Sequence, residues 1–418
     1  MIWGEKMDIE KQAVIVKSAS RVLAGVPTSK LNGAIRQIAQ SLTESAHLIM
    51  DANKLDMDYA KSLGTAQSKL DRLYLDEARI RSIADDANNV AVLPGVLGNF
   101  EGFTRPNGLR VAKIKVPLGV IGMIYESRPN VTVDATVLCL KSGNAVLLRG
   151  GKEAYNTNKA IVGIIKKALS MAGLPGDAVE LVHDLSRESV SRMMKLDKYL
   201  DLLIPRGGAG LIENVKNNST VPVIETGTGN CHIYIHEAAD FTMALEILLN
   251  AKVQRPSVCN ACESLLVDKS IAANLLPRIK EMLNEHKVRM LGCTDTCKII
   301  AIEEAADYDF YTEFNDLTIT VKTVDGLDAA IVHIDEHGTR HSETIITQDR
   351  QAADRFLRLI DAACVYHNAS SRFSDGAQLG FGAEIGISTQ KLHARGPFAM
   401  NELTTYKYVV EGNGQVRN

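Results

Sequence analysis

Cys259 is the residue of this sequence best suited to act as a nucleophile. It ends the proline-interrupted stretch Gln254-Arg-Pro-Ser-Val-Cys259 and lies just before the apolar run Leu265-Leu-Val267. This pattern predicts a cysteine at a loop or helix terminus, where backbone amides favour a thiolate and can bind an oxyanion. A free cysteine is more often a small buried hydrophobe, so the local pattern alone leaves a structural thiol open.

Two glycine-containing turns, each after an apolar run, are candidates for binding a nucleotide's phosphates. They are Leu148-Arg-Gly-Gly-Lys-Glu153 and Ile204-Pro-Arg-Gly-Gly-Ala-Gly210. Glycines let a backbone approach a pyrophosphate, and the following helix offers its free amides and positive end. Neither turn has the GxGxxG spacing, and each alone also fits a simple tight turn. Together, with basic residues beside them, they favour a dinucleotide. The residues proposed to contact it are Arg149, Gly150, Gly151, Lys152, Arg206, Gly207 and Gly208.

His333, His337 and His341 are spaced by four, which on one continuous helix would align three imidazoles for a metal ion. Gly338 and Thr339 argue against such a helix. We therefore expect contacts to a substrate anion, or plain packing, and no metal site.

The seven cysteines are odd in number and scattered, which does not suggest a disulfide framework. Two pairs, Cys259-x2-Cys262 and Cys293-x3-Cys297, have a spacing that structural zinc can use. A zinc-stabilised binding module without redox activity is therefore retained as an alternative.

The chain that positions these residues changes its pattern along its length. From about 8 to 92, apolar residues recur at three and four, which predicts amphipathic helices, one of them starting at Pro27-Thr-Ser29. Residues 102–117 alternate, as in a half-exposed antiparallel strand. Strand and helix signals then alternate, which predicts a parallel, doubly wound sheet. The expected segments are Gly119–Tyr125, Asn130–Lys141, Ala145–Arg149, Glu153–Ala172, Val179–Val182, Arg187–Lys195, Leu202–Pro205, Gly208–Asn217 and Val221–Glu225.

A second α/β segment is expected from His232 to about Leu392, followed by a strand-like tail over Leu403–Val410. That tail and residues 108–117 are both amphipathic and can pair into a protruding ribbon. The unpaired strand edges of such a ribbon can pair with another subunit, so we expect an oligomer, either a dimer or a tetramer.

Composition limits the function classes. The 418 residues are 45% hydrophobic and 23% charged, which allows two or three domains. Lys and Arg number 47 against 50 Asp and Glu, a formal net charge of −3, which speaks against nucleic acid or an anionic membrane as a partner. The sequence shows neither a secretory signal nor an apolar run of spanning length, so we expect a cytoplasmic protein.

Several motifs are similar to those of a known family. The order of Pro117-Leu-Gly-Val-Ile-Gly122, Ile224-Glu-Thr-Gly227 and then Cys259 resembles the aldehyde dehydrogenase superfamily. Within it, Tyr125-Glu-Ser-Arg-Pro-Asn130, Pro256-Ser-Val-Cys-Asn-Ala261 and the histidine-containing stretch Ala330–Ile345 resemble the γ-glutamyl phosphate reductases, and the likeness runs from about residue 10 to the C-terminus.

The resemblance implies an aldehyde dehydrogenase-like α/β fold with three parts. Residues 1–107 and 120–227 would form an NADP-binding domain with a doubly wound parallel sheet. Residues 228–397 would form an α/β catalytic domain, and residues 108–119 and 398–418 a small β arm for oligomerisation.

The resemblance also implies a reaction. Cys259 would attack γ-glutamyl phosphate, release phosphate and hold the acyl group as a thioester, which NADPH reduces to glutamate 5-semialdehyde, the second step of proline biosynthesis from glutamate. Asn130 and amides near Cys259 would bind the oxyanion. NAD is the second choice of cofactor, because only a nearby cation such as Arg149 or Lys152 selects the 2′-phosphate.

Glu225 occupies the position of the water-activating base in hydrolytic aldehyde dehydrogenases, which keeps a hydrolytic enzyme as a further alternative. A residue at a strand end near the nicotinamide is an equally good interpretation of Glu225. Glu313 matches the residue that holds the nicotinamide ribose in relatives. With these, the proposed cofactor contacts also include Thr226 and Gly227, and the proposed substrate contacts are Arg128, Asn260, His337, His341 and Ser342. A transient contact with glutamate 5-kinase, which makes the labile substrate, is also considered.

Overall fold

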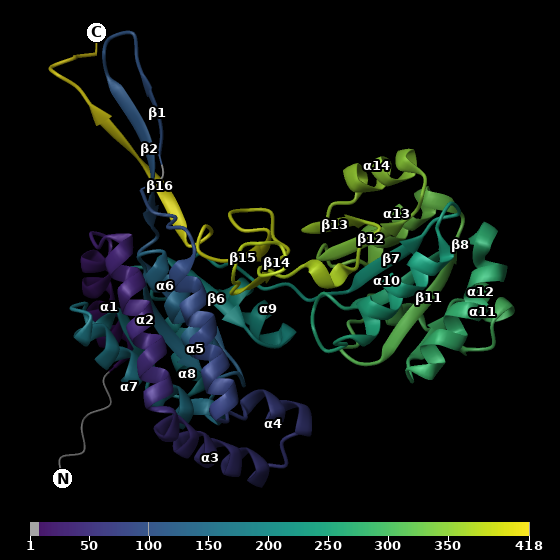
Figure 1. Cartoon of the computed structure of the whole chain (residues 1–418), viewed down its shortest axis with the longest axis horizontal. Helices are drawn as coiled ribbons and strands as arrows, with labels where there is room; N and C mark the ends of the chain where they lie inside the picture. Colours follow the sequence, from purple (N-terminus) through teal and green to yellow (C-terminus); the bar gives the residue numbers. More distant parts are fainter. Residues whose placement is uncertain (1–7, 99, 418) are drawn as a thin grey trace. The chain divides into compact units, whose positions relative to one another are not determined.

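The computed structural model describes residues 8–98 and 100–417. Residues 1–7, 99 and 418 lie outside the described residues, and with them most of the N-terminal stretch examined above for a secretory signal. The chain divides into two compact units (Figure 1). The first comprises Met1–Glu225, Phe381–Gly386 and Phe398–Asn418, and the second Thr226–Gly380 and Ile387–Pro397. The two units are described separately.

The first unit begins with helices, as the periodicity predicted. They are α1 (Ile9–Leu23), α2 (Thr28–Glu44), α3 (Ala46–Ser62), α4 (Gln67–Leu73) and α5 (Glu77–Val92). Helix α2 starts directly after Pro27, and Asp76 caps α5 by accepting a hydrogen bond from the Arg79 amide at 2.8 Å. The recurring apolar residues of α2, such as Leu31, Ile35 and Ile38, are fully buried.

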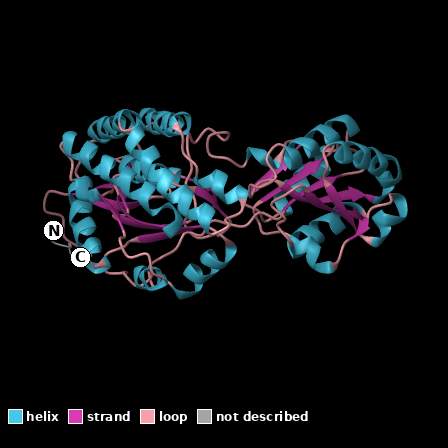
Figure 2. Cartoon of the chain, turned by 90° about the horizontal axis from the view of Figure 1, so that it is seen from below, coloured by secondary structure: helices cyan, strands magenta, loops and turns pink. Residues whose placement is uncertain are grey.

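A four-stranded parallel sheet of order β5-β4-β3-β6 forms the core of this unit, with helices around it (Figure 2). The prediction of a doubly wound sheet is confirmed. Its strands are β3 (Val120–Tyr125), β4 (Ala145–Gly150), β5 (Val179–Leu181) and β6 (Leu202–Arg206); its helices are α6 (Asn130–Lys141), α7 (Tyr155–Met171), α8 (Arg187–Met193) and α9 (Ala209–Asn218), with 3-10 turns η1 (Lys152–Ala154) and η2 (Gly176–Ala178).

The strand order reverses at β3, whose neighbours are β4 on one side and β6 on the other. In open α/β sheets, ligands bind outside the carboxyl ends of strands at such a reversal. The predicted strand Val221–Glu225 was wrong: only an isolated bridge, Leu203↔Val223, is present. Pro222 lacks the amide that a continuing strand needs.

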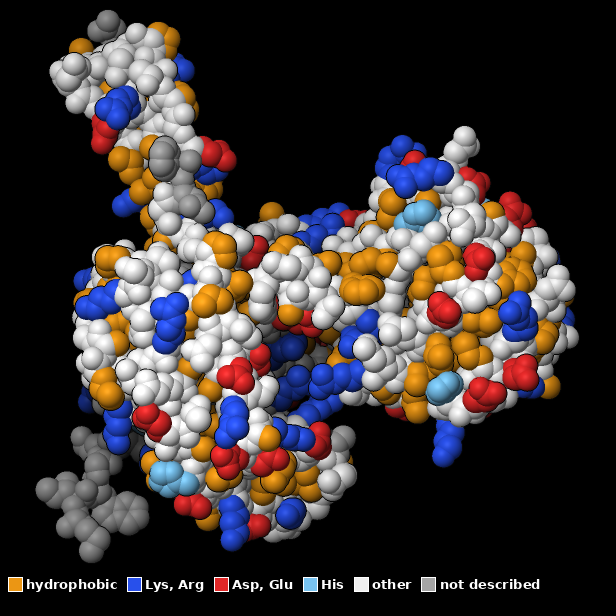
Figure 3. Space-filling view, in the orientation of Figure 1, with side chains coloured by type: hydrophobic (Ala, Val, Ile, Leu, Met, Phe, Trp, Pro, Cys, Tyr) orange, Lys and Arg blue, Asp and Glu red, His pale blue; other side chains and the backbone are white. Residues whose placement is uncertain are grey.

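The expected pairing of the two amphipathic segments is present, with one addition. Strands β1 (Phe100–Thr104), β2 (Arg110–Pro117) and β16 (Thr404–Glu411) form an antiparallel sheet of order β1-β2-β16. The single strand expected over residues 102–117 was wrong: a turn, closed by a hydrogen bond from the Gly108 amide to the Arg105 carbonyl at 2.9 Å, divides it into β1 and β2. Strand β1 therefore lies outside the predicted arm bounds of 108–119. Hydrophobic side chains lie among charged ones on the arm's surface (Figure 3), and Phe103, Tyr406, Tyr408 and Val410 are exposed.

The second unit contains a seven-stranded sheet of order β10-β9-β11-β8-β7-β12-β13, parallel throughout. Its strands are β7 (Cys231–Ile235), β8 (Cys262–Asp268), β9 (Arg289–Gly292), β10 (Glu303–Glu304), β11 (Thr318–Val324), β12 (Ser342–Ile346) and β13 (Cys364–His367). The helices are α10 (Phe241–Val253), α11 (Lys269–Glu285), α12 (Thr294–Ile299), α13 (Gly326–His337) and α14 (Arg350–Leu359), with 3-10 turns η3 (Asp307–Tyr311) and η4 (Ser371–Phe373). A separate pair is formed by β14 (Gly386–Ser388) and β15 (Gly396–Phe398).

Strand β8 shows that helices cover both faces of this sheet. Leu265 belongs to the hydrophobic cluster that includes α10 and α11, whereas Leu266 belongs to the cluster with α13 and Phe356 of α14. Because successive side chains point to opposite faces, the apolar run Leu265–Val267 packs against helices on both sides. Within the described residues, no helix combines the length and apolarity that crossing a membrane requires.

A fully buried ion pair joins α10 to β8. Lys252 Nζ lies 2.6 Å from Glu263 Oε2, and neither side chain is exposed. Burial raises the pKa of Glu263 to about 7, although Lys252 opposes the shift. The Asn315 amide also donates to Glu263, at 3.2 Å. The pair thus connects a helix, a strand and the loop before β11.

A second buried polar group lies on α13, which ends at His337 as the glycine at 338 suggested, so His341 is not on this helix. His333 and His337 stack with ring centroids 4.0 Å apart, and Lys322 Nζ lies 3.1 Å from His333 Nδ1. Burial, followed by the positive groups around it, lowers the pKa of His333 to about 2. His333 is therefore neutral in the folded protein.

Replacing Lys252 with Met should cost about 3–5 kcal/mol of unfolding free energy, because Glu263 would be left buried without its partner. The double variant Lys252→Met/Glu263→Leu should recover most of that loss. Urea denaturation measures both. The matched control is Arg289→Met, which breaks the exposed Arg289–Glu303 pair and should cost less than about 1 kcal/mol. Equal losses at the two pairs would contradict the prediction.

Acid should destabilise the protein partly through His333. Its pKa is depressed in the folded state, so its contribution is full above the unfolded value of about 6.5 and is lost as the pH falls below it. His333→Gln should therefore flatten the stability curve between pH 6.5 and 4, by up to about 1.4 kcal/mol per pH unit. Denaturation at several pH values tests this, with the exposed His286→Gln as a control that keeps the wild-type slope.

Candidate active site

Cys259 lies in the loop between α10 and β8 and is partly exposed. Its backbone packs directly on Gly229, in the segment before β7. A Cβ atom added to Gly229 would lie 1.5 Å from the Cys259 carbonyl oxygen and 2.8 Å from its Cα. No residue with a side chain fits there unless the Cys259 peptide moves. Gly229 is therefore required for the position of the candidate nucleophile.

Two further groups hold this arrangement. The Cys231 thiol donates to the Cys259 carbonyl oxygen at 3.2 Å, and Glu313 Oε1 accepts a hydrogen bond from the Gly229 amide at 2.8 Å. Cys231 is fully buried, and burial raises its pKa, so it acts as a neutral donor. One carboxylate oxygen of Glu313, the residue proposed above to hold a ribose, is thus engaged by the Gly229 backbone that packs against Cys259.

Asn260, the residue after Cys259, is hydrogen-bonded to η4 and to the residue that follows it. Its Nδ2 donates to the carbonyls of Ser374 at 2.9 Å and Arg372 at 3.4 Å, while the Ser371 hydroxyl donates to the Asn260 carbonyl at 2.7 Å. Asn260 is only 4% exposed. Its side chain therefore positions the loop, which the sequence motif could not distinguish from a substrate contact.

Arg372 was not among the residues proposed from the sequence. It lies on η4, and its Nε donates to Gln254 Oε1 at 3.1 Å, five residues before Cys259. Burial lowers the pKa of Arg372, Arg255 lowers it further, and Cys259 opposes the shift. The structure thus adds Arg372 to the residues beside the loop that carries Cys259. Residues 371–374 stand far from Cys259 in the sequence, so only the folded chain reveals this proximity.

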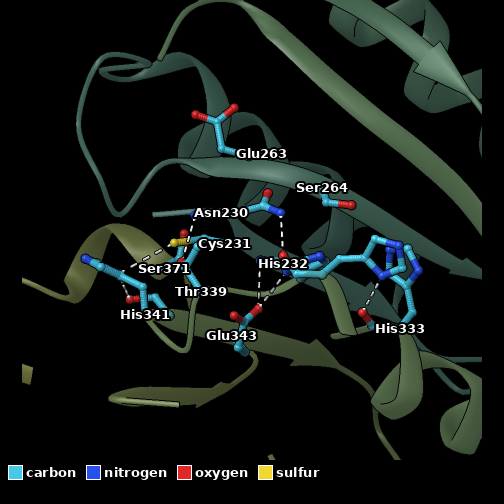
Figure 4. Close-up of polar contacts among 12 residues, drawn as sticks. Asn230, Cys231, His232, Glu263, Ser264, His333, Thr339, His341, Glu343 and Ser371 are labelled. Carbon is cyan, nitrogen blue, oxygen red and sulfur yellow. Dashed lines mark hydrogen bonds and ion pairs between the residues drawn. The ribbon is translucent and has the colours of Figure 1, made fainter. Parts of the chain in front are cut away.

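His341 and Ser342 are fully buried behind the loop rather than at a surface. His341 Nδ1 lies 2.8 Å from Ser342 Oγ and 3.6 Å from Cys231 Sγ. Ser342 Oγ is also hydrogen-bonded to Ser374 Oγ at 2.5 Å. Figure 4 shows His341 beside Cys231 and Ser371, so the group supports the two segments that hold Cys259.

His232 and Glu343 form a second polar group nearby (Figure 4). Glu343 Oε2 accepts from the His232 amide at 2.8 Å and lies 3.1 Å from its Nδ1, and both side chains are fully buried. Burial raises the pKa of Glu343, and His232 opposes that shift. Asn230 donates to the carbonyls of Phe310 and His337, which ties the start of β7 to η3 and α13. His337 itself is held by its ring contacts and by donation to the His333 carbonyl.

In the first unit, the proposed nucleotide residues gather at the carboxyl ends of β3, β4 and β6. The Gly208 amide at the start of α9 donates to Glu126 Oε2 at 3.1 Å, and Glu153 Oε1 accepts from the Ser127 amide at 2.8 Å. Two carboxylates thus accept hydrogen bonds from backbone amides at the carboxyl edge of this sheet. Neither carboxylate was identified from the sequence.

The basic residues of this edge differ in what they can do. The Arg149 guanidinium donates hydrogen bonds to the carbonyl oxygens of Gly150, Leu185 and Ser186, at 2.8, 2.9 and 3.0 Å. Its contacts therefore favour a structural role over a phosphate contact. Lys152 is exposed at the start of η1. Arg206 ends β6 beside Gly207 and Gly208.

Close packing explains the first glycine of each turn. A Cβ atom on Gly150 would lie 2.3 Å from Asn158 Nδ2, and one on Gly207 would lie 2.7 Å from a Glu126 carboxylate oxygen. At Gly151 the neighbour is the Glu153 carboxylate. Gly208 has open space instead, with nothing within 4 Å of such an atom.

Asn130 is the first residue of α6, two residues after Arg128, which lies in the turn following β3. Its Nδ2 donates to Asp134 Oδ2 at 2.9 Å, and burial raises the pKa of Asp134 to about 7. Asn144, the other asparagine of this region, is fully committed to structure: it accepts from the Gly119 amide and donates to the Leu403 carbonyl, at 2.7 and 2.8 Å.

Glu225 is the last residue of the first unit's main segment, and Lys216 of α9 forms an ion pair with it at 3.0 Å. Thr226 and Gly227 belong to the second unit. Thr226 is buried, and the Gly227 amide donates to the Ile387 carbonyl at 2.8 Å. The Lys216 contact directs the Glu225 carboxylate toward α9.

Comparison with known proteins agrees with this architecture. The model of the aldehyde dehydrogenase family matches residues 4–315. The γ-glutamyl phosphate reductase of Caldicellulosiruptor bescii is 52% identical over 416 residues, 98% of this chain and 99% of that protein. The one from Caldanaerobacter subterraneus subsp. tengcongensis is 51% identical over 413 residues, 98% of this chain and 100% of that protein.

The crystal structure of γ-glutamyl phosphate reductase from Thermotoga maritima superimposes with a TM-score of 0.97 at 47% identity, covering 99% of this chain and 100% of that one. Sequence and fold therefore agree over the whole length. The chain belongs to the aldehyde dehydrogenase family and, within it, to the γ-glutamyl phosphate reductases.

Proposed function

We propose that this protein reduces L-γ-glutamyl 5-phosphate to L-glutamate 5-semialdehyde and phosphate, the second step of proline biosynthesis from glutamate. Cys259 is the nucleophile and NADPH the reductant. The observation that carries the proposal is the partly exposed Cys259, whose peptide is held by Gly229 and the Cys231 thiol. The near full-length identity to proteins named γ-glutamyl phosphate reductase supports the substrate.

The covalent step follows from the chemistry of an acyl phosphate. The Cys259 thiolate forms a bond to the acyl carbon, the carbon–oxygen bond to phosphate breaks, and phosphate takes the electron pair. A thioester accepts hydride far more readily than a carboxylate, so dividing the reduction into two steps lowers its barrier. After hydride addition, the carbon–sulfur bond breaks and the aldehyde leaves.

Asn130 is our candidate for the oxyanion. Its side-chain NH₂ already donates one hydrogen to Asp134 and has a second for a substrate oxygen. Donors held in place before the reaction stabilise developing negative charge without reorganising.

The reductant is a nicotinamide cofactor, as in the aldehyde dehydrogenase family, and it supplies the hydride when bound. The first unit offers the reversal point between β3 and β6 for its pyrophosphate, where Gly208 leaves open space at the start of the ten-residue helix α9. A pyrophosphate bound to the Gly208 amide would replace the Glu126 carboxylate as its acceptor. Lys152 and Arg206 are the cations we assign to phosphate binding, and Lys152 is our candidate for the 2′-phosphate that makes NADP the preferred cofactor. Arg149 supports the turn through its carbonyl contacts. On this proposal, Thr226, Gly227 and Glu313 contribute to the nicotinamide end.

For the substrate, the proposed contacts are Arg128, Asn260, His337, His341 and Ser342. His341 and Ser342 are fully buried and contact each other, which favours an indirect role for these two. We further propose that the arm mediates assembly into a dimer or tetramer, because its exposed tyrosines and strand edges need a cover. A transient contact with glutamate 5-kinase would shorten the exposure of the labile acyl phosphate. All seven cysteines are free, in keeping with a cytoplasmic enzyme.

Cys259→Ser should reduce turnover by on the order of a thousandfold or more, because the thioester cannot form. The assay uses glutamate 5-semialdehyde, NADP and inorganic phosphate, and follows NADPH absorbance. Omitting phosphate should stop the wild-type reaction. Cys297→Ser, a partly exposed cysteine elsewhere, should keep full activity. Oxidation that needs no phosphate and disappears in Glu225→Gln would instead identify a hydrolytic aldehyde dehydrogenase.

Gly229→Ala should lower turnover by about a hundredfold while leaving NADP binding unchanged, because its Cβ displaces the Cys259 peptide and a displacement of about 1 Å has an effect of this size. Labelling of Cys259 with a thiol reagent should slow in parallel. Gly163→Ala, where nothing lies within 4 Å of the added atom, is the matched control. Wild-type activity in Gly229→Ala would show that the close contact does not position the nucleophile.

A further inference from the structure

The backbone that carries Arg372 is fixed to the nucleophile's loop. Ser371 and Asn260 are both buried, and the Ser371 hydroxyl donates a hydrogen bond to the Asn260 carbonyl. The Asn260 side chain in turn donates to the carbonyls of Arg372 and Ser374. Any movement of η4 therefore also moves the residue after Cys259. Arg372 has a defined place beside the loop, unlike a long side chain on a free surface.

The guanidinium of Arg372 is directed along the same loop. Its Nε donates to Gln254 Oε1 at 3.1 Å, which leaves the Nη groups for another partner. Arg255, the next residue after Gln254, lies close enough to lower the pKa of Arg372, and Cys259 is close enough to act in the opposite direction. Arg372 thus lies within electrostatic range of both Arg255 and Cys259.

Within the part of the chain that the structure describes, neither Arg372 nor Arg255 forms an ion pair with a carboxylate. Asp375 is within electrostatic reach of Arg372. However, its Oδ1 accepts from the amides of Ala377 and Gln378, at 2.9 and 3.1 Å. Positive charge next to positive charge is unfavourable unless an anion joins them.

We propose that Arg372, assisted by Arg255, binds the phosphate group of the substrate beside Cys259. This inference rests on the proposed function, since it assigns a partner to the leaving group of that reaction. A guanidinium matches two phosphate oxygens at once. As the Cys259–carbon bond forms and the carbon–oxygen bond breaks, the electron pair moves onto phosphate, and Arg372 stabilises the growing charge. The substrate's α-carboxylate is a weaker candidate, because three carbons separate it from the carbon that Cys259 attacks.

The test measures alkylation of Cys259 in the full-length protein by iodoacetate, an anion, and by neutral iodoacetamide, with peptide mass spectrometry to identify the labelled residue. The ratio of the two rate constants isolates the effect of charge. Arg372→Gln should lower this ratio about tenfold or more, and Arg372→Lys should restore part of it. Inorganic phosphate should slow wild-type alkylation with saturation but leave Arg372→Gln unprotected. Arg358→Gln, an exposed arginine of α14, is the matched control and should behave as wild type.

An unchanged ratio in Arg372→Gln, with Cys259 still labelled, would overturn this inference while leaving the proposed function intact. Protection by glutamate but not by phosphate would also overturn it, in favour of the α-carboxylate. If the Arg372→Gln protein does not fold, Arg255→Gln provides the same measurement, and its ratio should fall in the same direction. By contrast, full turnover by Cys259→Ser would refute the proposed function itself.

Discussion

The contact between the Cys259 peptide and Gly229 is the constraint on which the second unit's active-site architecture depends. Two backbone segments approach so closely that only glycine fits, and the Cys231 thiol completes the contact from the first residue of β7. The β7–β8 ladder has an irregular register between Cys231 and His232. Such irregularities re-aim side chains next to active sites. Here the irregularity lets Cys231 face the loop while the rest of β7 pairs regularly with β8.

Buried polar groups surround this contact, and stability alone does not explain them. Lys252–Glu263, between α10 and β8, and His232–Glu343, between β7 and β12, are fully buried pairs. Removing the charges of an ion pair such as Lys252–Glu263 from water costs several kcal/mol, so well-packed apolar residues would often serve stability equally well. The carboxylates of these pairs also accept hydrogen bonds from particular backbone amides, which holds those segments in place. Glu263 accepts from the Asn315 amide, two residues after Glu313, and Glu343 accepts from the amide of His232. Both therefore fix backbone segments that lead to the Gly229 contact.

Local patterns in the sequence predicted much of the fold but few of the site's contacts. The segment Asn130–Lys141 was predicted at the bounds that α6 has, because helix signals are local. The expected strand at 221–225 was wrong, since Pro222 and a single bridge partner leave no ladder. Arg372 could not be identified, because its relation to Cys259 depends on hydrogen bonds between segments about 110 residues apart in sequence. Likewise, no local signal distinguishes Arg149, which satisfies its own turn's carbonyls, from a phosphate ligand.

Electrostatics ties the nucleophile to its substrate in a way that net charge does not reveal. The chain carries a formal charge of −3, and an acyl phosphate is itself an anion, so the overall field does not attract it. Attraction must come from a few partly desolvated cations close to the reacting atoms, where a lower dielectric strengthens each interaction. On the proposed mechanism, a guanidinium beside Cys259 would favour the thiolate before the reaction and the departing phosphate during it. The same charge would give no advantage to neutral water, in keeping with the proposed thioester, which must persist until hydride arrives.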